Sequence, residues 1–403
     1  MKQLSKIETA LIQTIDQQRM LDRTQSWAAT NSGTSNLAGL AQVAQMLAEA
    51  FSCLPGEVTL REPAAVTVVD PNGREADKQH GKHLVCSVRP EAERRFLLTG
   101  HMDTVFPADH PFQDQVWLDD ETLNGPGTAD MKAGLAIMLE ALTAFEASDA
   151  ATSVGYDIMI NSDEETGSLS SAALIDQLAR GKHAALTYEP SALPDGTLAH
   201  ARGGSGNFSV TFTGKSAHAG RNPQDGRNAI VAAADCAVRL KAMQHGDLPI
   251  NPAKIDGGAA NNVVPDHAVL RFNIRPKTTE AAEKFALDLN NLLRNIETAH
   301  DVSAHCHGGI SRPPKPVDAR AQKLFDLVRD TGAALGQTIG WQSTGGVCDG
   351  NNIAANHVPV VDTMGVRGGK IHSPDEFMIV PSLSERAQLS AIVLHRLATG
   401  EAL

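Results

Sequence analysis

The chain has 403 residues, of which 42% are hydrophobic and 20% are charged. This composition is typical of a globular protein with a large core, and the length favours two or three domains. The formal net charge is −12, which argues against nucleic acid or an anionic membrane surface as a partner. No apolar stretch reaches the roughly 18 residues of a membrane-spanning helix, so we expect no membrane span.

The N-terminal segment has an apolar residue at every third or fourth position, interrupted by Glu8 and Asp16. This spacing predicts an amphipathic helix and not a signal peptide. The five cysteines are scattered, odd in number and without a CxxC pair. We therefore expect a reduced, cytoplasmic protein that has no cysteine zinc site.

Strands and helices alternate in the region that follows two N-terminal helical patterns. The expected strands are rich in β-branched and apolar residues, and the expected helices are apolar on one face. In chain order they are strands 84–88 and 95–99, helix 132–145, strand 156–160, a helix around 170–179 and strand 184–188. Such alternation is typical of the α/β class, in which helices cover both faces of a sheet.

The pattern changes at RGGSG, which has the composition of a linker. The segments that follow are strand 208–213, helix 226–243, a turn-rich stretch containing NPAKIDGGAANN, strand 269–274, helix 279–299 and strand 302–306. Their order resembles the β-α-β-β-α-β unit of ferredoxin-like α+β folds.

A second linker, RPPKP, ends this region, because its prolines cannot continue a helix or a central strand. The α/β pattern then resumes and closes with a helix at 382–397. We therefore predict a discontinuous main domain, residues 1–202 and 313–403, with a smaller domain inserted at 203–312.

The first candidate functional residues lie in GHMDTV, directly after strand 95–99. His101 and Asp103 are two positions apart, so their side chains point to the same side of an extended chain. In open α/β sheets the carboxyl ends of strands face the ligand crevice. A histidine beside a carboxylate suits a metal ligand together with the group that fixes its tautomer. A structural hydrogen bond between the two residues is the alternative.

Carboxylates occupy comparable positions in three further segments. Asp130 lies in a Gly/Pro-rich turn before a helix, either as a metal ligand or as a helix cap. Asp163, Glu164 and Glu165 follow an apolar strand, where one carboxylate can bind a metal while the next acts as general base. A solvated loop is the ordinary explanation of such a run. Glu189 ends another apolar strand.

His372, in the late loop GGKIHSPDE, completes the set. Each of these residues is unremarkable alone, since the chain has 15 histidines. Their shared position, just beyond a strand or beside a glycine turn, is what indicates a site. Two histidines and three carboxylates can hold two Zn²⁺ ions about 3.5–4 Å apart through a shared carboxylate.

Together GHMDTV, NGPGTADMKAG, SDEETGS, YEP and IHSPDE resemble the motifs of the M20 family of metallopeptidases and deacylases, over nearly the whole chain. Within that family, GTADMKAG, YEPSA and TGKSAHAG are most similar to glutamate carboxypeptidases of the G2 type. The resemblance implies a zinc-exopeptidase-like catalytic domain with a mixed sheet. It also implies a lid domain that forms a homodimer, and a small substrate with a free carboxylate.

Carried over by position, the resemblance makes Asp130 the carboxylate that bridges two Zn²⁺ ions per subunit, with Co²⁺ or Mn²⁺ as alternatives. His101 and Glu189 would complete one metal site. His372 and Glu165 would complete the other.

The resemblance also implies catalytic roles for three residues. Glu164 would be the general base, and Asp103 would orient the metal-binding His101. His218 would cross the dimer interface and polarise the scissile carbonyl in the partner's site, although a histidine in a surface loop is the alternative.

Substrate contacts are implied for Asn262, Arg275, Gly345 and Gly346, which resemble positions that hold a substrate's carbonyl oxygen and terminal carboxylate. A guanidinium such as that of Arg275 can grip a carboxylate through two parallel hydrogen bonds. Arg312 is a weaker match to a second carboxylate-binding arginine, and an exposed linker arginine is the alternative.

The resemblance predicts a metal-dependent hydrolase, and first of all a G2-like carboxypeptidase that releases a C-terminal amino acid. A deacylase of N-acyl amino acids is the alternative, of the acetylornithine deacetylase, succinyl-diaminopimelate desuccinylase or aminoacylase type. A non-catalytic metal-containing binding protein is a third reading, against which the presence of both Glu164 and His218 argues.

Overall fold

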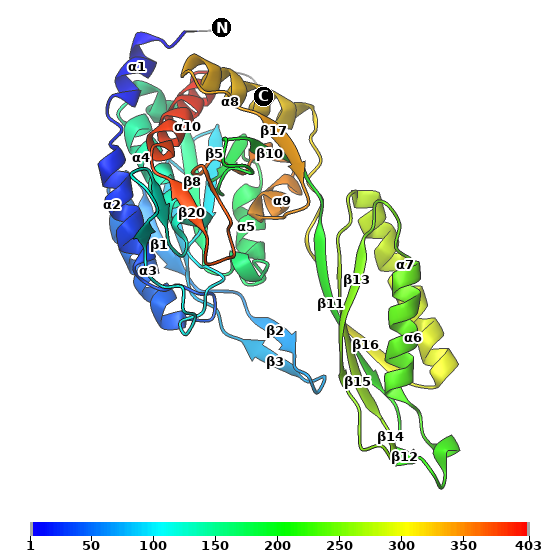
Figure 1. Ribbon diagram of the computed structural model, residues 1–403. Coiled ribbons are helices and arrows are strands. Elements are labelled where there is room, and N and C mark those ends of the chain that lie inside the picture. Colours follow the sequence, from blue (N-terminus) through cyan, green and yellow to red (C-terminus); the bar gives the residue numbers. More distant parts are fainter. Residues whose placement is uncertain (1–2, 401–403) are drawn as a thin grey trace.

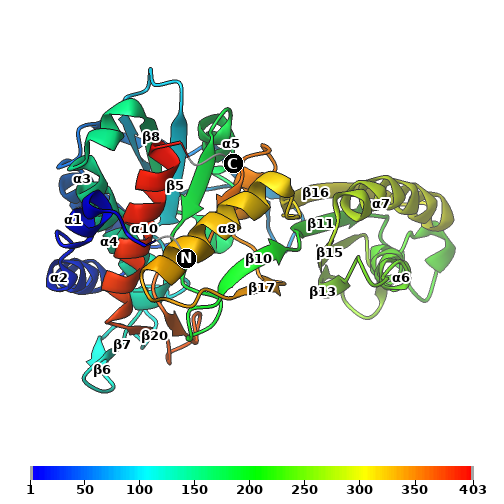
Figure 2. The same cartoon turned by 90° about the horizontal axis from the view of Figure 1, so that it is seen from above.

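The computed structural model describes residues 3–400, which form a large helix-covered sheet and a smaller elongated unit beside it (Figure 1). Seen from above in Figure 2, the smaller unit projects away from the main body beyond the end of α8 (Ala319–Ala334). Strands β11 (Ser205–Thr213) and β16 (Ser303–Arg312) connect the two parts.

The main sheet has six strands in the order β1-β4-β8-β5-β9-β18. Their bounds are β1 Glu57–Arg61, β4 His83–Val88, β8 Gly155–Asn161, β5 Arg95–His101, β9 Ala184–Thr187 and β18 Val360–Val361. The pairs β1–β4 and β4–β8 are antiparallel, whereas β8, β5, β9 and β18 run parallel. The predicted mixed sheet is therefore confirmed.

Helices cover both faces of this sheet, as predicted for the α/β class. They are α1 Lys6–Ile12, α2 Gln17–Ala28, α3 Leu37–Phe51, α4 Ala133–Glu146, α5 Ala172–Ala179, α8, α9 Asp349–Ala354 and α10 Ser382–Ala398. Side chains alternate across a strand, so Phe96 and Leu98 of β5 join the core with α3, α4 and α10, while Leu97 joins the core with α5 and α9.

The N-terminal segment differs from the single helix that its spacing predicts. It forms two helices, α1 and α2, separated by a short break. Asp16 begins the second helix, because its carboxylate accepts a hydrogen bond from the backbone N–H of Arg19 at 3.1 Å. No helix among residues 3–400 is both long and apolar enough to span a bilayer, and all five cysteines are free thiols.

The smaller unit contains a four-stranded antiparallel sheet in the order β13-β15-β11-β16, with two helices on one face. The remaining elements are α6 Ala229–Ala242, β13 Ile250–Gly257, β15 His267–Ile274 and α7 Thr279–His300. This order and connectivity are those of a ferredoxin-like unit, which confirms the predicted fold class. We propose that it is an inserted lid bounded, as the sequence predicts, at 203–312.

One segment of the lid was predicted wrongly. The stretch NPAKIDG, interpreted as turns because of its Pro, Asn and Gly residues, belongs to strand β13. Its proline is tolerated because β13 lies at the edge of the sheet and the pairing register shifts between Pro252 and Lys254.

The chain leaves the main body and returns to it at adjacent points. Arg202 and Lys315 form an antiparallel bridge in which each backbone N–H donates to the other residue's carbonyl, at 3.0 and 2.9 Å. Their buried side chains meet at Asp362, whose Oδ2 lies 2.8 Å from both Arg202 Nε and Lys315 Nζ. This junction holds the two crossings together.

Three short sheets complete the main body, and one pair of strands lies at the far end of the lid. In the main body, β2 Val66–Val69 pairs with β3 Glu75–Lys78, and β10 Leu198–Arg202 pairs with β17 Trp341–Thr344. The third sheet contains β6 Val116–Trp117, β7 Thr122–Asn124, β19 Gly368–Gly369 and β20 Phe377–Ile379. In the lid, β12 Ala217–His218 pairs with β14 Val263–Val264. The β2–β3 hairpin reaches the lid, where Arg271 Nη2 donates to the carbonyls of Val69 and Asp70 at 2.9 Å each (Figure 1).

Candidate metal centre

The candidate metal centre lies at the carboxyl edge of the main sheet. His101 is the last residue of β5, Glu189 comes two residues after β9, and Glu164 and Glu165 follow β8. Because these strands are parallel, their carboxyl ends meet at one edge of the sheet. Residues that are far apart in the sequence are therefore brought together.

Two further loops supply the remaining predicted ligands. Asp130 lies in the turn Thr128–Lys132 that leads into α4, and its side chain is buried. His372 lies between β19 and β20, with a left-handed backbone (φ 63°) and a half-exposed side chain. The solvent-facing side of the centre is therefore the side of His372.

The carboxylate of Asp130 faces two different histidines. Its Oδ1 lies 3.0 Å from His101 Nε2, and its Oδ2 lies 3.3 Å from His372 Nε2. A glutamate accompanies each histidine: Glu189 Oε2 is 3.6 Å from His101 Nε2, and Glu165 Oε2 is 3.0 Å from His372 Nε2. The five side chains thus form two His–Glu pairs that share one aspartate, which is the grouping implied by the resemblance.

Burial and the crowding of three carboxylates shift the pKa values in this cluster. Burial raises the pKa of both Glu165 and Glu189 to about 7, an effect to which the neighbouring Asp130 adds. Burial also raises the pKa of Asp130, but hydrogen bonds from His101 and His372 more than offset this and hold it well below its usual value. The contacts with Asp130 and Glu165 raise the pKa of His372 to about 11.

The donor set fits divalent cations. Two imidazoles and three carboxylates are ligands that zinc and similar ions accept. In addition, the buried Oε1 of Glu189 has no hydrogen-bond partner in the described chain, and an unpaired buried carboxylate oxygen is costly unless a cation balances it. The ligand atoms of His101, Asp130 and Glu165 lie within 4.8 Å of one another, as do those of His101, Glu164 and Glu189.

Asp103 contacts both His101 and the loop that carries Glu164 and Glu165. His101 Nδ1 lies 3.0 Å from the backbone carbonyl of Asp103 and 3.4 Å from its Oδ1. The carboxylate itself accepts hydrogen bonds from the backbone N–H groups of Glu164 and Glu165, both at 3.2 Å. Asp103 therefore contacts His101 chiefly through its main chain, and its side chain also holds the loop that carries both glutamates.

Glu376 is a residue that sequence reasoning missed. Its buried Oε1 accepts hydrogen bonds from the backbone N–H groups of Ala129 and Asp130, both at 3.0 Å. Burial, with the nearby Asp130, raises the pKa of Glu376 to about 8. Only its place in IHSPDE, four residues after His372, could have pointed to it.

Strand β12, which ends with His218, and β14, which Asn262 directly precedes, lie at the end of the lid, away from the main body (Figure 1). β12 pairs with β14, and the N–H of Ala219 donates to the carbonyl of Asn262 at 2.9 Å. His218 Nδ1 accepts from the N–H groups of Gly220 and Arg221, at 3.1 and 3.2 Å. In the neutral imidazole the proton therefore resides on Nε2, on an exposed side chain.

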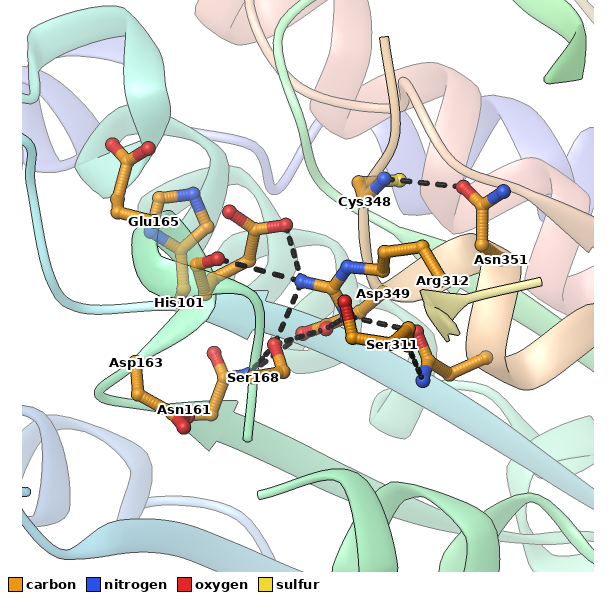
Figure 3. Close-up of polar contacts among 12 residues, drawn as sticks. His101, Asn161, Asp163, Glu165, Ser168, Ser311, Arg312, Cys348, Asp349 and Asn351 are labelled. Atoms are coloured by element: carbon orange, nitrogen blue, oxygen red, sulfur yellow. Dashed lines mark hydrogen bonds and ion pairs between the residues drawn. The ribbon is translucent and has the colours of Figure 1, made fainter. Parts of the chain in front are cut away.

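The remaining predicted substrate residues divide into two groups. Arg275, Gly345 and Gly346 are exposed, and no hydrogen bond or ion pair in the described chain joins them to the metal-centre residues. Arg312 is 1% exposed, and its Nη2 donates to Glu164 Oε1 at 2.7 Å. Figure 3 shows this guanidinium beside the residues of the centre. The alternative of an exposed linker arginine is therefore wrong.

Comparison with known sequences gives a family match and two informative relatives. The model of peptidase family M20/M25/M40 matches residues 97–396. Carboxypeptidase G2 of Pseudomonas sp. (strain RS-16) is 26% identical over 379 residues, which cover 92% of this chain and 87% of that protein. Succinyl-diaminopimelate desuccinylase of Psychrobacter sp. (strain PRwf-1) is 26% identical over 326 residues, covering 75% of this chain and 79% of that protein.

Solved structures share the fold over almost the entire chain. A tripeptidase from Staphylococcus aureus subsp. aureus Mu50 has 25% sequence identity and a TM-score of 0.72, covering 96% of this chain and all of that one. The Bacillus subtilis YXEP protein, described as a dinuclear metal-binding peptidase of the M20 family, has 14% identity and a TM-score of 0.64. The match covers 94% of this chain and 98% of that one.

Proposed function

The chain belongs to peptidase family M20/M25/M40 and is an M20 metallohydrolase, and from this premise we propose that it uses two divalent cations, Zn²⁺ first among them, to hydrolyse an amide bond beside a free carboxylate. The observation that carries the proposal is the geometry of Asp130. Each of its oxygens faces a different histidine, and each histidine has its own glutamate. One carboxylate between two equivalent pairs is the arrangement expected of a two-metal site.

When bound, two such cations supply Lewis acidity, which polarises an amide carbonyl and makes water a nucleophile near neutral pH. Glu164 is the group best situated to move the protons. It lies beside His101 and Glu189 but is not needed among the five ligands. In this scheme Glu164 accepts a proton from the attacking water and returns it to the leaving amine.

The expected oxyanion donor is His218 of the partner subunit in a homodimer. Two arguments support this role: the neutral ring of the exposed His218 carries its proton on Nε2, and β12, which ends with His218, lies at the end of the lid away from the main body (Figure 1). A hydrogen bond to the developing oxyanion stabilises the transition state more than the ground state.

His218→Ala is expected to lower kcat by about 10²–10³-fold, the usual effect of losing one oxyanion donor. If the histidine acts across the dimer, mixing this variant with Glu164→Gln should restore activity. Random exchange would give about one quarter of the wild-type rate, since half of the dimers are hybrids with one intact site. Subunit exchange is checked by mass spectrometry of differently tagged chains. Exchanged hybrids that stay inactive would contradict the crossed arrangement.

Substrate anchoring is assigned to Arg275, Asn262, Gly345 and Gly346. Arg275 is exposed, and within residues 3–400 the one hydrogen bond of its side chain runs from Nε to Asn273 Oδ1 at 2.9 Å. The two Nη groups thus stay free to hold a carboxylate through parallel hydrogen bonds. Asn262 and the backbone of the two glycines would hold a carbonyl oxygen and the carboxylate, which fixes the bond presented to the metal centre.

The preferred substrate class is that of a G2-like exopeptidase, which releases a C-terminal amino acid. Carboxypeptidase G2, which matches 92% of this chain, supports this choice. A deacylase of N-acyl amino acids is the alternative, and the similarity to a desuccinylase favours it.

A substrate panel separates the two classes. Purified protein, metal-depleted and then reloaded with Zn²⁺, Co²⁺ or Mn²⁺, is assayed on dipeptides and on N-acyl amino acids that share the same C-terminal residues. Faster turnover of peptides and N-aroyl glutamates supports the exopeptidase, and faster turnover of acetyl or succinyl compounds supports the deacylase. Absence of turnover by every metal-loaded form would reject the proposed function.

A further inference from the structure

Arg312 occupies the point where the lid chain re-enters the main body. It is the last residue of β16 and is followed by two prolines. A guanidinium that is 1% exposed needs partners for its charge and its N–H groups, because a buried unpaired charge is strongly destabilising. The identity of these partners therefore indicates its role.

All N–H groups on the two terminal nitrogens of Arg312 are engaged within the chain (Figure 3). Nη1 donates to Asp349 Oδ1 at 2.5 Å and to Asn352 Oδ1 at 2.8 Å. Nη2 donates to Glu164 Oε1 at 2.7 Å and to Ser168 Oγ at 2.8 Å. Two-point binding of another carboxylate needs two adjacent free N–H groups, and after these four bonds only the Nε group remains.

We propose that Arg312 positions the side chain of Glu164 and does not bind the substrate's carboxylate, an inference that rests on the proposed role of Glu164 as the base. Arg312 donates a hydrogen bond to Oε1 of Glu164, while within residues 3–400 no hydrogen bond engages Oε2 of Glu164. One oxygen of the base is thereby fixed, and the other is free to exchange a proton. Such positioning matters because a misplacement of about 1 Å can lower a rate by about 10²-fold.

The other side of Arg312 is anchored in the main body. Asp349 accepts hydrogen bonds from Asn161 Nδ2 at 2.8 Å and from Ser168 Oγ at 2.6 Å. Asn161 is the last residue of β8, and Asp349 begins α9. The guanidinium therefore links the base to two elements of the rigid sheet-and-helix framework.

Glycines surround this anchor on both crossings. Gly308 and Gly309 precede Arg312 in β16, and Gly308 has a φ of 99°, a conformation that favours glycine. Between β10 and β11, Gly204 approaches the Arg312 carbonyl so closely that a Cβ would lie 2.7 Å from it.

The test compares two substrates that share one scissile bond, one with a free C-terminal carboxylate and one with a primary amide in its place. For Arg312→Gln we expect kcat to fall by about 10–10²-fold on both substrates, with KM nearly unchanged on each. Zinc content and melting temperature report whether the centre and the fold are retained. Arg312→Lys, which keeps a buried positive charge, is the second variant and should recover part of kcat.

Arg275→Gln is the matched control, because Arg275 is the proposed carboxylate anchor. It should raise KM for the acid substrate and leave the amide substrate almost unaffected. If Arg312→Gln instead gives this selective rise in KM, or leaves kcat unchanged, the positioning role is overturned. Wild-type enzyme that turns over neither substrate would reject the proposed function itself, before any variant is compared.

Discussion

Glu164→Gln is expected to lower kcat by about 10²–10⁴-fold, the range that a positioned general acid–base group contributes. The amide has nearly the shape of the carboxylate and can still accept from Arg312 Nη2, which now donates to Oε1 at 2.7 Å. It cannot accept a proton from water. Steady-state kinetics on the best substrate of the panel, with zinc content measured on the same samples, checks the result.

The companion variant Glu165→Gln distinguishes base from ligand. Glu165 lies 3.0 Å from His372 Nε2, so its loss should deplete metal as well as activity, whereas Glu164→Gln should keep both ions. The opposite pattern of metal content would mean that the two neighbouring glutamates have exchanged roles.

Asp130→Asn is expected to have the largest effect of any single substitution. One side chain faces both histidines, so its change weakens both metal sites together, and we expect zinc content to fall from two ions towards none. Losing the Lewis acid removes several kcal/mol of transition-state stabilisation, which corresponds to a rate loss of about 10³-fold or more. Elemental analysis and competition with a chromogenic chelator measure the affinity without relying on activity.

Asp375→Asn is the control for this variant. Asp375 belongs to the same IHSPDE loop as His372, but its side chain is 71% exposed and pairs with Lys370 at the surface. It should retain two ions and full activity. Retention of both ions by Asp130→Asn would contradict a shared bridging carboxylate.

The main sheet and the convergence of the five candidate ligands could be predicted from sequence because local signals and topology agree. Strands such as 95–101 are apolar runs that end in a polar motif, and parallel strands place those ends at one edge. Once the strands were identified, His101 and Glu189 were expected to converge.

Other features depend on contacts that leave no local pattern. The edge strand β13 escaped prediction because proline and glycine are tolerated where one side of a strand is unpaired. Glu376 acts on backbone N–H groups, which every sequence has. The partners of Arg312 arise from the path of the chain at the junction, so its burial could not be inferred from RPPKP.

The bridge between Arg202 and Lys315 has a consequence for evolution and engineering. Because the two crossings meet backbone to backbone, the segment between them leaves and re-enters the main body at one place, and it contributes no strand to the six-stranded sheet. The segment can therefore lengthen, shrink or be exchanged while the metal-bearing framework keeps its own connectivity. Divergence in the segment can thus accumulate as long as the residues with a proposed role in the reaction, such as His218 and Arg312, are kept.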